Sequence, residues 1–233
     1  MARAGSPLAH AGDDVEKIFR NAQPRPPAAT SPRPAAPLVR PWREAPPLLT
    51  GALCTLREPV GADAPSLLMA LGAEDLRELA PQAPTPTITG VEAFVADLQD
   101  RRSSGAAAAW AIVPRDAQAP VGLLVVRGLD HAFTMVAVTA VVAAEFRGTG
   151  LFQDAAATLL DLLFGAMGVH RIEVRVDVRN ARANGALRKL GATQEGVLRQ
   201  AERRDGGFRD HVLWGLVAAD WAAQRDFEPT RIH

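Results

Sequence analysis

A glycine-containing turn between an apolar run and a long amphipathic segment is the feature that most constrains the fold of this chain. The apolar run spans Phe133 to Val142, the turn is Arg147-Gly148-Thr149-Gly150, and apolar residues recur at helical spacing from about Leu151 to Met167. The first amides of such a helix have no partner within it and attract an anion. Gly148 and Gly150 carry no side chain that would keep a diphosphate from these amides. Taken alone, the turn could equally be a plain connector.

Two common phosphate-binding motifs do not account for this turn. A P-loop requires the pattern G-x-x-x-x-G-K-[ST], which the sequence lacks. A dinucleotide-binding turn requires a glycine three positions after Gly150, where Gln153 stands, and it opens a parallel unit, whereas the runs before this turn read as antiparallel. A phosphate bound here would therefore belong to another kind of site.

Proline and alanine dominate the N-terminal part of the chain. From Gln23 to Pro47 they are too frequent for regular backbone pairing and favour an extended, solvated chain. We expect a disordered tail over residues 1–47, one folded domain over residues 48–225 and a short C-terminal tail over residues 226–233. A segment that docks on a partner or on the domain itself is the alternative for the N-terminal tail.

The folded part combines strand-like and helix-like patterns. Two helices precede the central strands, one capped by Asp63 and one by Thr89, and two follow them, at about Leu151 to Met167 and Arg182 to Leu190. The strand-helix-strand unit around the long helix implies locally parallel pairing. We predict one α/β (α+β) domain with a mixed, mostly antiparallel sheet of seven strands and about four helices. The expected strands are Leu53–Arg57, Ala108–Val113, Val121–Arg127, Phe133–Val142, Arg171–Val178, Thr193–Gln200 and Asp210–Val217.

Composition narrows the class of protein. The 233 residues carry a formal net charge of +0 and are 48% apolar, which is typical of a globular domain and gives no electrostatic footprint for nucleic acid or an anionic membrane. No run approaches the roughly 20 apolar residues of a membrane-spanning helix. Cys54 is the only cysteine, so no disulfide forms within the chain, and we expect a cytoplasmic protein without a metal site.

Three segments together resemble the GNAT superfamily of N-acetyltransferases. Glu145 to Gly150 is similar to its [Q/R]-x-x-G-x-[G/A] signature, in the E-x-x-G-x-G form common in the branch of ribosomal-protein-alanine N-acetyltransferases. Asn180 to Gly191 resembles that branch's N-x-x-S…L-x-K-L-G segment, and Glu195 to Trp214 resembles its closing hairpin. The order and spacing of the three segments match over about residues 48–225, so the resemblance implies a single GNAT-like domain there.

The resemblance implies a site for acetyl-CoA. Main-chain groups of Val141 and Val142 would bind the pantetheine arm, and Asn180 would contact the coenzyme near the thioester, which makes it the implied catalytic residue. The alternatives are a place in the strand core for the two valines and a helix cap for Asn180. Arg147 could add charge-assisted bonds to phosphate oxygens. The implied diphosphate-binding residues are Phe146, Arg147, Gly148, Thr149, Gly150, Leu151 and Phe152.

The proton donor usual in that family is missing from this chain. Its members often protonate the leaving thiolate with a Tyr or Ser hydroxyl, but this sequence has no Tyr, and Ala183 occupies the Ser position. The strand before the turn offers only Thr134 and Thr139 as polar side chains, so no strong base is expected there. At neutral pH, freeing a lysine amine costs about 4–5 kcal/mol, whereas freeing an α-amine costs about 1 kcal/mol. Such a site should prefer α-amines.

We therefore predict an N-acetyltransferase that moves an acetyl group from acetyl-CoA to a primary amine, either a peptide or protein α-amine or a small amine. The alternative is a catalytically silent acyl-CoA-binding or protein-interaction domain with the same fold, which the missing hydroxyl at Ala183 would suit. A structural domain whose N-terminal tail recruits a partner is a third reading. The acceptor and the oligomeric state, including a homodimer, stay open.

Overall fold

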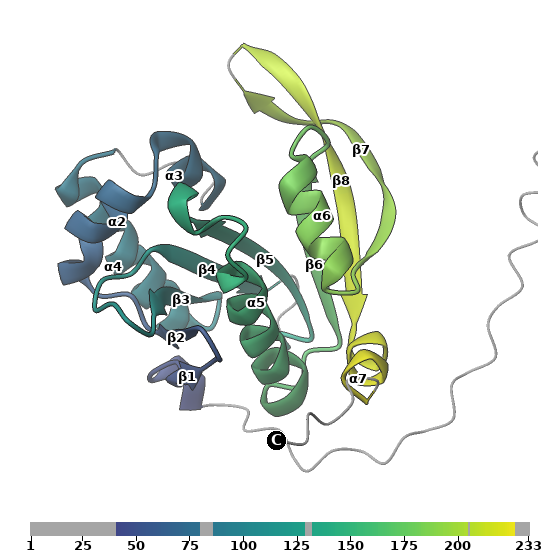
Figure 1. The fold of residues 1–233 in the computed structure, drawn as a ribbon, viewed down its shortest axis with the longest axis horizontal. Helices are drawn as coiled ribbons and strands as arrows, with labels where there is room; N and C mark the ends of the chain where they lie inside the picture. The colour runs from purple at the N-terminus through teal and green to yellow at the C-terminus, as the bar shows by residue number, and fades with distance from the viewer. Residues whose placement is uncertain (1–40, 80–85, 129–131, 205, 227–233) are drawn as a thin grey trace, which may run out of the picture. The chain divides into compact units, whose positions relative to one another are not determined.

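The computed structural model describes residues 41–79, 86–128, 132–204 and 206–226, which form one mixed sheet with its helices (Figure 1). The strand order is β1-β2-β3-β4-β5-β6-β8-β7. Neighbouring strands are antiparallel except β5 and β6, which run parallel. The predicted mixed, mostly antiparallel sheet is confirmed, with a short additional strand, β1. The strands are β1 Leu49–Thr50, β2 Cys54–Arg57, β3 Ala107–Pro114, β4 Gly122–Gly128, β5 Met135–Val142, β6 Arg171–Asp177, β7 Thr193–Arg204 and β8 Gly207–Val217.

The described residues contain six α-helices, where about four were expected. The helices are α2 Ala64–Ala70, α3 Ala73–Leu79, α4 Ile88–Ser104, α5 Leu151–Asp161, α6 Ala181–Lys189 and α7 Ala218–Asp226. α3 escaped prediction because only Leu76 and Leu79 of its short span are buried, and α7 because it follows β8 without a turn residue. α5 continues through a π-helical turn at Leu162–Ala166. None of these helices is both long and apolar enough to cross a membrane.

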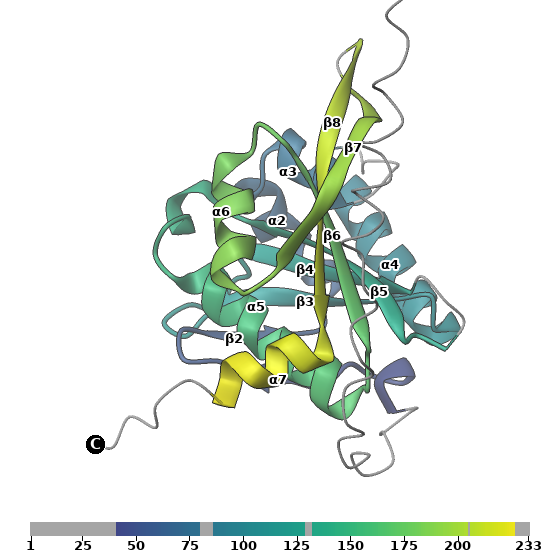
Figure 2. The same cartoon turned by 90° about the vertical axis from the view of Figure 1, so that its right-hand side faces the viewer.

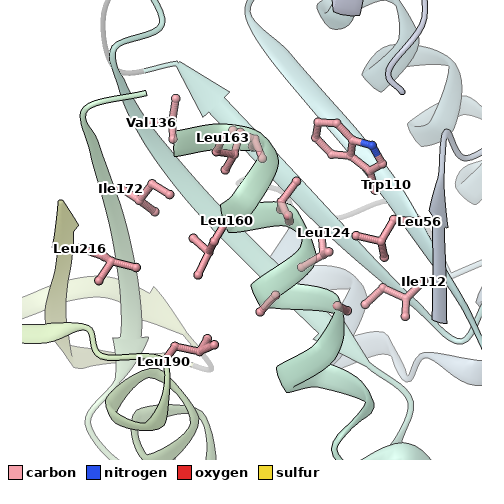
Figure 3. Close-up of a cluster of buried hydrophobic side chains, with 14 of the residues drawn as sticks. Leu56, Trp110, Ile112, Leu124, Val136, Leu160, Leu163, Ile172, Leu190 and Leu216 are labelled. Atoms are coloured by element: carbon pink, nitrogen blue, oxygen red, sulfur yellow. The ribbon is translucent and has the colours of Figure 1, made fainter. Parts of the chain in front are cut away.

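The sheet separates two apolar layers. In β3, Trp110 and Ile112 belong to the layer that contains α5, whereas Ala109 and Ala111 belong to the layer that contains α2, α3 and α4. Both faces of this strand are covered, so it is buried along its length instead of alternating. Figure 3 shows the side chains of the first layer gathered around α5. Figures 1 and 2 show the β7–β8 hairpin extending beyond the rest of the sheet.

α4 confirms the predicted apolar stripe but not the predicted cap. Thr87, rather than Thr89, caps the helix, because its Oγ1 accepts a hydrogen bond from the Gly90 amide at 3.1 Å. Thr89 lies inside the first helical turn, and the sequence pattern alone does not separate two threonines so close together. The buried residues of the stripe are Val91, Phe94, Val95 and Leu98.

The folded domain begins earlier than the predicted boundary. Pro41–Arg43 forms a 3-10 turn, Trp42 is 7% exposed, and its ring centroid lies 4.8 Å from that of Phe133. Residues 41–47 therefore belong to the domain and not to the tail, because burial of an indole ring outweighs the disorder that the neighbouring prolines favour. The rest of the two predicted tails, residues 1–40 and 227–233, lies outside the described residues.

Asp63 was expected to cap α2 but makes other bonds. Both of its carboxylate oxygens accept hydrogen bonds of 2.7 Å from the Arg57 guanidinium, and one accepts a bond of 2.9 Å from the Val60 amide. Burial of Asp63 raises its pKa, but the hydrogen bonds from Arg57 and Val60 and the Arg57 charge outweigh burial, so the net pKa lies below the usual value. The buried carboxylate is thus ionised and joins the end of β2 to the start of α2.

Asp63→Asn should lower the free energy of unfolding by about 1–3 kcal/mol at pH 7, because the variant loses a charged partner of Arg57 in a buried setting. A lowered folded-state pKa means that the carboxylate stabilises the fold above the unfolded-state pKa near 4, and that this contribution disappears as pH falls through the folded-state value. The stability difference between wild type and variant, measured by urea unfolding, should therefore shrink between pH 7 and pH 2.

Asp97→Asn is the matched control, since it removes an ion pair with Arg101 on the surface of α4, where both side chains are about half exposed. It should change stability by no more than about 0.5 kcal/mol. Equal losses in the two variants would contradict the role given to Asp63.

Candidate active site

β5 and β6 pair over only three residues and then separate. Their parallel register ends at Ala137 and Glu173. Beyond that point β5 stays paired with β4 as far as Val142, and β6 stays paired with β8 as far as Asp177. Each strand is thus held from its far side, and two strand edges face each other across an opening in the sheet (Figure 1).

A cavity of about 970 Å³ occupies this opening. Its walls are the diverging parts of β5 and β6, the first turns of α5 and one face of α6, and charged residues of α3 and of the β7–β8 hairpin also line it. A cavity of this size accommodates an extended small-molecule ligand.

The direction of the backbone along β5 decides which groups face this cavity. The Val141 carbonyl points toward β4, since a Cβ placed on Gly122 would lie 2.5 Å from its oxygen. The Val142 carbonyl points the other way and accepts a hydrogen bond from Arg147 Nε at 3.1 Å. Because backbone groups alternate along a strand, those of Ala140 also face the cavity. Both valines were predicted from the sequence, whereas Ala140 was not.

The glycine turn has the open geometry that the sequence predicted. Gly148 and Gly150 have φ values of 84° and 91°, in the left-handed region that glycine adopts without strain. No atom lies within 4 Å of a Cβ placed on Gly148, so the space beside it is open. The Thr149 hydroxyl donates to the Phe146 carbonyl at 2.8 Å and accepts from the Leu151 amide at 3.3 Å, which fixes the shape of the turn.

Four amides at this junction have no acceptor among the residues that the structure describes. They lie at the positive end of the α5 dipole, and all four residues line the cavity. Unpaired amides at a helix start that opens on a cavity favour a bound anion, and two glycines among them let a diphosphate approach closely. The four are Gly148, Gly150, Phe152 and Gln153.

Arg147, which was predicted to contact phosphate, is engaged by protein groups. Its Nη2 donates to both carboxylate oxygens of Asp75 on α3, at 2.8 and 2.9 Å. Together with its bond to Val142, this pair fastens the glycine turn to α3. A phosphate bound at the turn would share this guanidinium with Asp75.

Asp154 anchors the first turn of α5 to the start of β2. Its carboxylate accepts hydrogen bonds from the amides of Ala52, Leu53 and Cys54, at 2.8, 2.8 and 3.2 Å, and from the Cys54 thiol at 3.4 Å. Burial first, and then the hydrogen bond and charge of Asp154, raise the pKa of Cys54 to about 12. Cys54 is therefore a buried, protonated thiol and not a nucleophile.

Two asparagines organise the start of α6. Asn180 caps the helix, since its Oδ1 accepts a hydrogen bond from the Ala183 amide at 3.0 Å, and it also lines the cavity. Asn184, which was not predicted as a site residue, is 9% exposed. It donates to the carbonyls of Asp177 and Asn180 and accepts from Trp214 Nε1 at 2.8 Å. A polar residue at an otherwise apolar position of the helix was the only sign of this role. Asn184 joins α6 to β6 and β8.

The side of the cavity formed by α3, the end of β6 and the β7–β8 hairpin carries carboxylates that are mostly paired with arginines. Thr139 is the one hydroxyl-bearing residue among the described cavity-lining residues. A hydrogen bond from Arg179 lowers the pKa of Asp177, so this carboxylate is ionised and binds protons weakly. Glu78 of α3 is paired with Arg204 of the hairpin. The arrangement suits positioning and charge complementarity better than proton transfer by a dedicated side chain.

The structure brings most of the predicted site residues to one cavity. Three of the predicted residues do not line it: Leu151 is buried in the core, Phe146 packs against the core, and Thr149 shapes the turn. The predicted residues that line the cavity are Val141, Val142, Arg147, Gly148, Gly150, Phe152 and Asn180.

Comparison with known proteins gives one consistent family. Residues 54–193 match the family model described as the acetyltransferase (GNAT) domain. The [ribosomal protein uS5]-alanine N-acetyltransferase of Escherichia coli (strain K12) is 26% identical over 141 residues, which cover 59% of this chain and 71% of that protein. The structure of Mycobacterium smegmatis RimJ in complex with CoA-disulfide has a TM-score of 0.62 and 25% identity, covering 77% of this chain and 93% of the other. Ribosomal-protein-S5-alanine acetyltransferase from Vibrio fischeri shares the fold, with a TM-score of 0.64, 21% identity and coverage of 75% and 98%.

The Cys54 thiol should resist modification in the folded protein. With a pKa of about 12 and no exposed surface, it should react with a disulfide reagent at pH 8 only as fast as the protein unfolds, and it should react at once in urea. The absorbance of the thiolate that the reagent releases gives the rate of reaction. A fast stoichiometric reaction without denaturant would show that the Asp154–Cys54 contact does not hold in solution.

Proposed function

Because this chain belongs to the acetyltransferase (GNAT) domain family, we propose that it transfers the acetyl group of acetyl-CoA to the α-amine at the N-terminus of a protein or peptide. The observation that carries the proposal is the cavity between β5 and β6, with a turn of unpaired amides at its edge. The cavity supplies space for the extended arm that carries the thioester, and the turn supplies hydrogen-bond donors for a diphosphate.

The residues present fit acetyl-CoA. The unpaired amides from Gly148 to Gln153 would hold the diphosphate, and the cavity-facing main-chain groups of Ala140 and Val142 would bond the amides of the pantetheine arm. The coenzyme supplies an activated acetyl thioester. Asn180 lies at the cavity, and its Oδ1 accepts the hydrogen bond that caps α6. A contact with the coenzyme would therefore use its side-chain Nδ2.

The acceptor would approach along the charged side of the cavity. Carboxylates of Glu74, Asp75, Glu78 and Asp177 line this region. Arginines pair closely with the last three, so Glu74 is the carboxylate left to attract a positive ammonium group. The relative from E. coli is named for an alanine acceptor on a ribosomal protein, which supports a protein N-terminus. A small amine is the second acceptor class. A ribosomal-protein acceptor would place the reaction in the cytoplasm.

Positioning would supply most of the rate enhancement. The unprotonated amine attacks the thioester carbonyl, a C–N bond forms as the C–S bond breaks, and the proton leaves the nitrogen for water or the departing thiolate. A thiol with a pKa near 8.5 leaves without a dedicated acid, which is consistent with Ala183 at the position of the family's hydroxyl. Strand amides beside the thioester would stabilise the developing oxyanion.

Gly148→Ala should raise the dissociation constant for CoA by about tenfold or more, measured by calorimetry. The variant places a side chain in the open space beside the amides, at a φ of 84° that costs a non-glycine residue about 1–2 kcal/mol. Gly206→Ala is the matched control, because Gly206 has a φ of 77°, is equally open and lies in the hairpin turn. Equal effects of the two variants on CoA binding would count against a diphosphate at Gly148.

A peptide with a free N-terminus and no lysine should be acetylated about 400-fold faster at pH 7 than a peptide with a blocked N-terminus and one lysine. The difference of about 2.6 pKa units between the two amines sets this ratio when the site lacks a strong base. Mass spectrometry of the products over time gives the rates. Preference for lysine would contradict the proposed acceptor, and tight CoA binding without any product would favour the catalytically silent alternative.

A further inference from the structure

The two strands that border the opening present different side chains to the two faces of the sheet. On β6, Val174 and Val176 pack against the apolar layer that contains α5 and α6. Side chains alternate along a strand, so Arg175 between them points to the face that carries α2, α3 and α4. On β5, Val141 belongs to the layer of α2, α3 and α4, and Thr139, two residues earlier, shares its face. Thr139 and Arg175 therefore line the cavity on the face away from α5 and its glycine turn.

Arg175 has no protein partner, unlike the paired arginines of the cavity. Arg147, Arg179 and Arg204 each form an ion pair with a carboxylate. Within the parts of the chain that the structure describes, Arg175 forms no ion pair and no side-chain hydrogen bond, and it is exposed. The cations of α6 lie on the other face of the sheet, with the layer that contains α5. The charge of Arg175 is thus available to a ligand that enters from the face of α3.

Arg175 lies near the narrow end of the opening. The pairing of β6 with β5 ends at Glu173, so Arg175 is two residues, or about 6.6 Å of strand, past the point where the strands part. With the diphosphate on the glycine turn and the pantetheine arm bonded to Val142 and then Ala140, the thioester would lie toward the same narrow end. An acceptor amine that reaches the thioester from the face of Arg175 would leave the next residues of its chain beside this guanidinium.

We propose that Arg175 selects acceptor chains that carry an acidic side chain, aspartate or glutamate, at their second residue. The inference rests on the proposed function, since it concerns the same acceptor. Consecutive Cα atoms are about 3.8 Å apart, so the side chain of the second residue stays within reach of an arginine that flanks the amine. A guanidinium binds a carboxylate through two parallel N–H donors. The nearby carboxylate of Asp177 does not compete for Arg175, because it is paired with Arg179.

Two lysine-free peptides with an N-terminal alanine, which differ only in glutamate or glutamine at the second residue, test this assignment with the full chain and acetyl-CoA. Wild type should acetylate the glutamate peptide with a kcat/KM about tenfold higher, as expected for one charge-assisted contact. Arg175→Gln should bring the two values to within about twofold of each other. Arg175→Glu should instead favour a peptide with arginine at the second residue. Calorimetry should give both variants the wild-type affinity for CoA.

Arg199→Gln is the matched control, because Arg199 is an exposed cation on β7 that does not line the cavity. It should keep the wild-type ratio, and equal thermal unfolding curves establish that the variants fold. Equal rates for the two peptides with wild type, or an unchanged ratio in Arg175→Gln, would overturn the assignment while leaving the proposed function standing. Weaker CoA binding by Arg175→Gln would also overturn it and assign the side chain to the coenzyme. Acetylation of neither peptide by wild type would overturn both proposals.

Discussion

The parting of β5 from β6 is the constraint on which the rest of this structure depends. Two parallel strands that pair over three residues and then separate leave backbone donors and acceptors without partners, and such groups must be satisfied by solvent or by a ligand. The opening is stable because β4 and β8 pair with the outer edges of the two strands. In addition, the apolar side of α5 packs into the apolar layer on its face of the sheet (Figure 3). The site is thus built from an interruption of the sheet, supported on all sides by complete structure.

The first turn of α5 is fixed from three directions, which keeps its unpaired amides in place. Asp154 ties it to the start of β2, Gln153 ties it to α6, and Arg147 ties the preceding turn to α3. None of these contacts consumes the amides that face the cavity. Preorganised donors of this kind bind an anion without a cost of rearrangement.

The lining of the cavity carries charges of both signs, and several of them are paired. The coenzyme region has amides and glycines, whereas α3 contributes carboxylates to the opposite region. The ion pairs Arg147–Asp75 and Arg204–Glu78 hold α3 between the glycine turn and the β7–β8 hairpin. An anionic coenzyme would meet complementary charge at the glycine turn, and the missing hydroxyl at Ala183 is tolerable because a thiolate is a good leaving group.

Local patterns in the sequence predicted local structure well. The apolar spacing of α4, the antiparallel run of β3, β4 and β5, and the glycine turn before α5 all depend on neighbours along the chain, and each is confirmed. Local patterns could not predict the separation of β5 from β6. Val138 to Val142 have the pattern of an ordinary strand, and they form a binding edge only because β6 does not pair with them. Trp42 was missed because its burial depends on Phe133, far along the chain, and the pairing of Arg147 with Asp75 was missed for the same reason. The three matched family segments, not periodicity, pointed to the coenzyme.

Amide hydrogen exchange with and without CoA tests whether the coenzyme lies between β5 and β6. If the coenzyme occupies the opening between β5 and β6, its addition should slow exchange at the unpaired amides from Gly148 to Gln153 and at the cavity-facing amides of β5 at Ala140 and Val142. Amides of β3, which are paired on both sides, should change little by comparison. Unchanged exchange at the turn and at β5 under saturating CoA would show that the coenzyme does not occupy this opening.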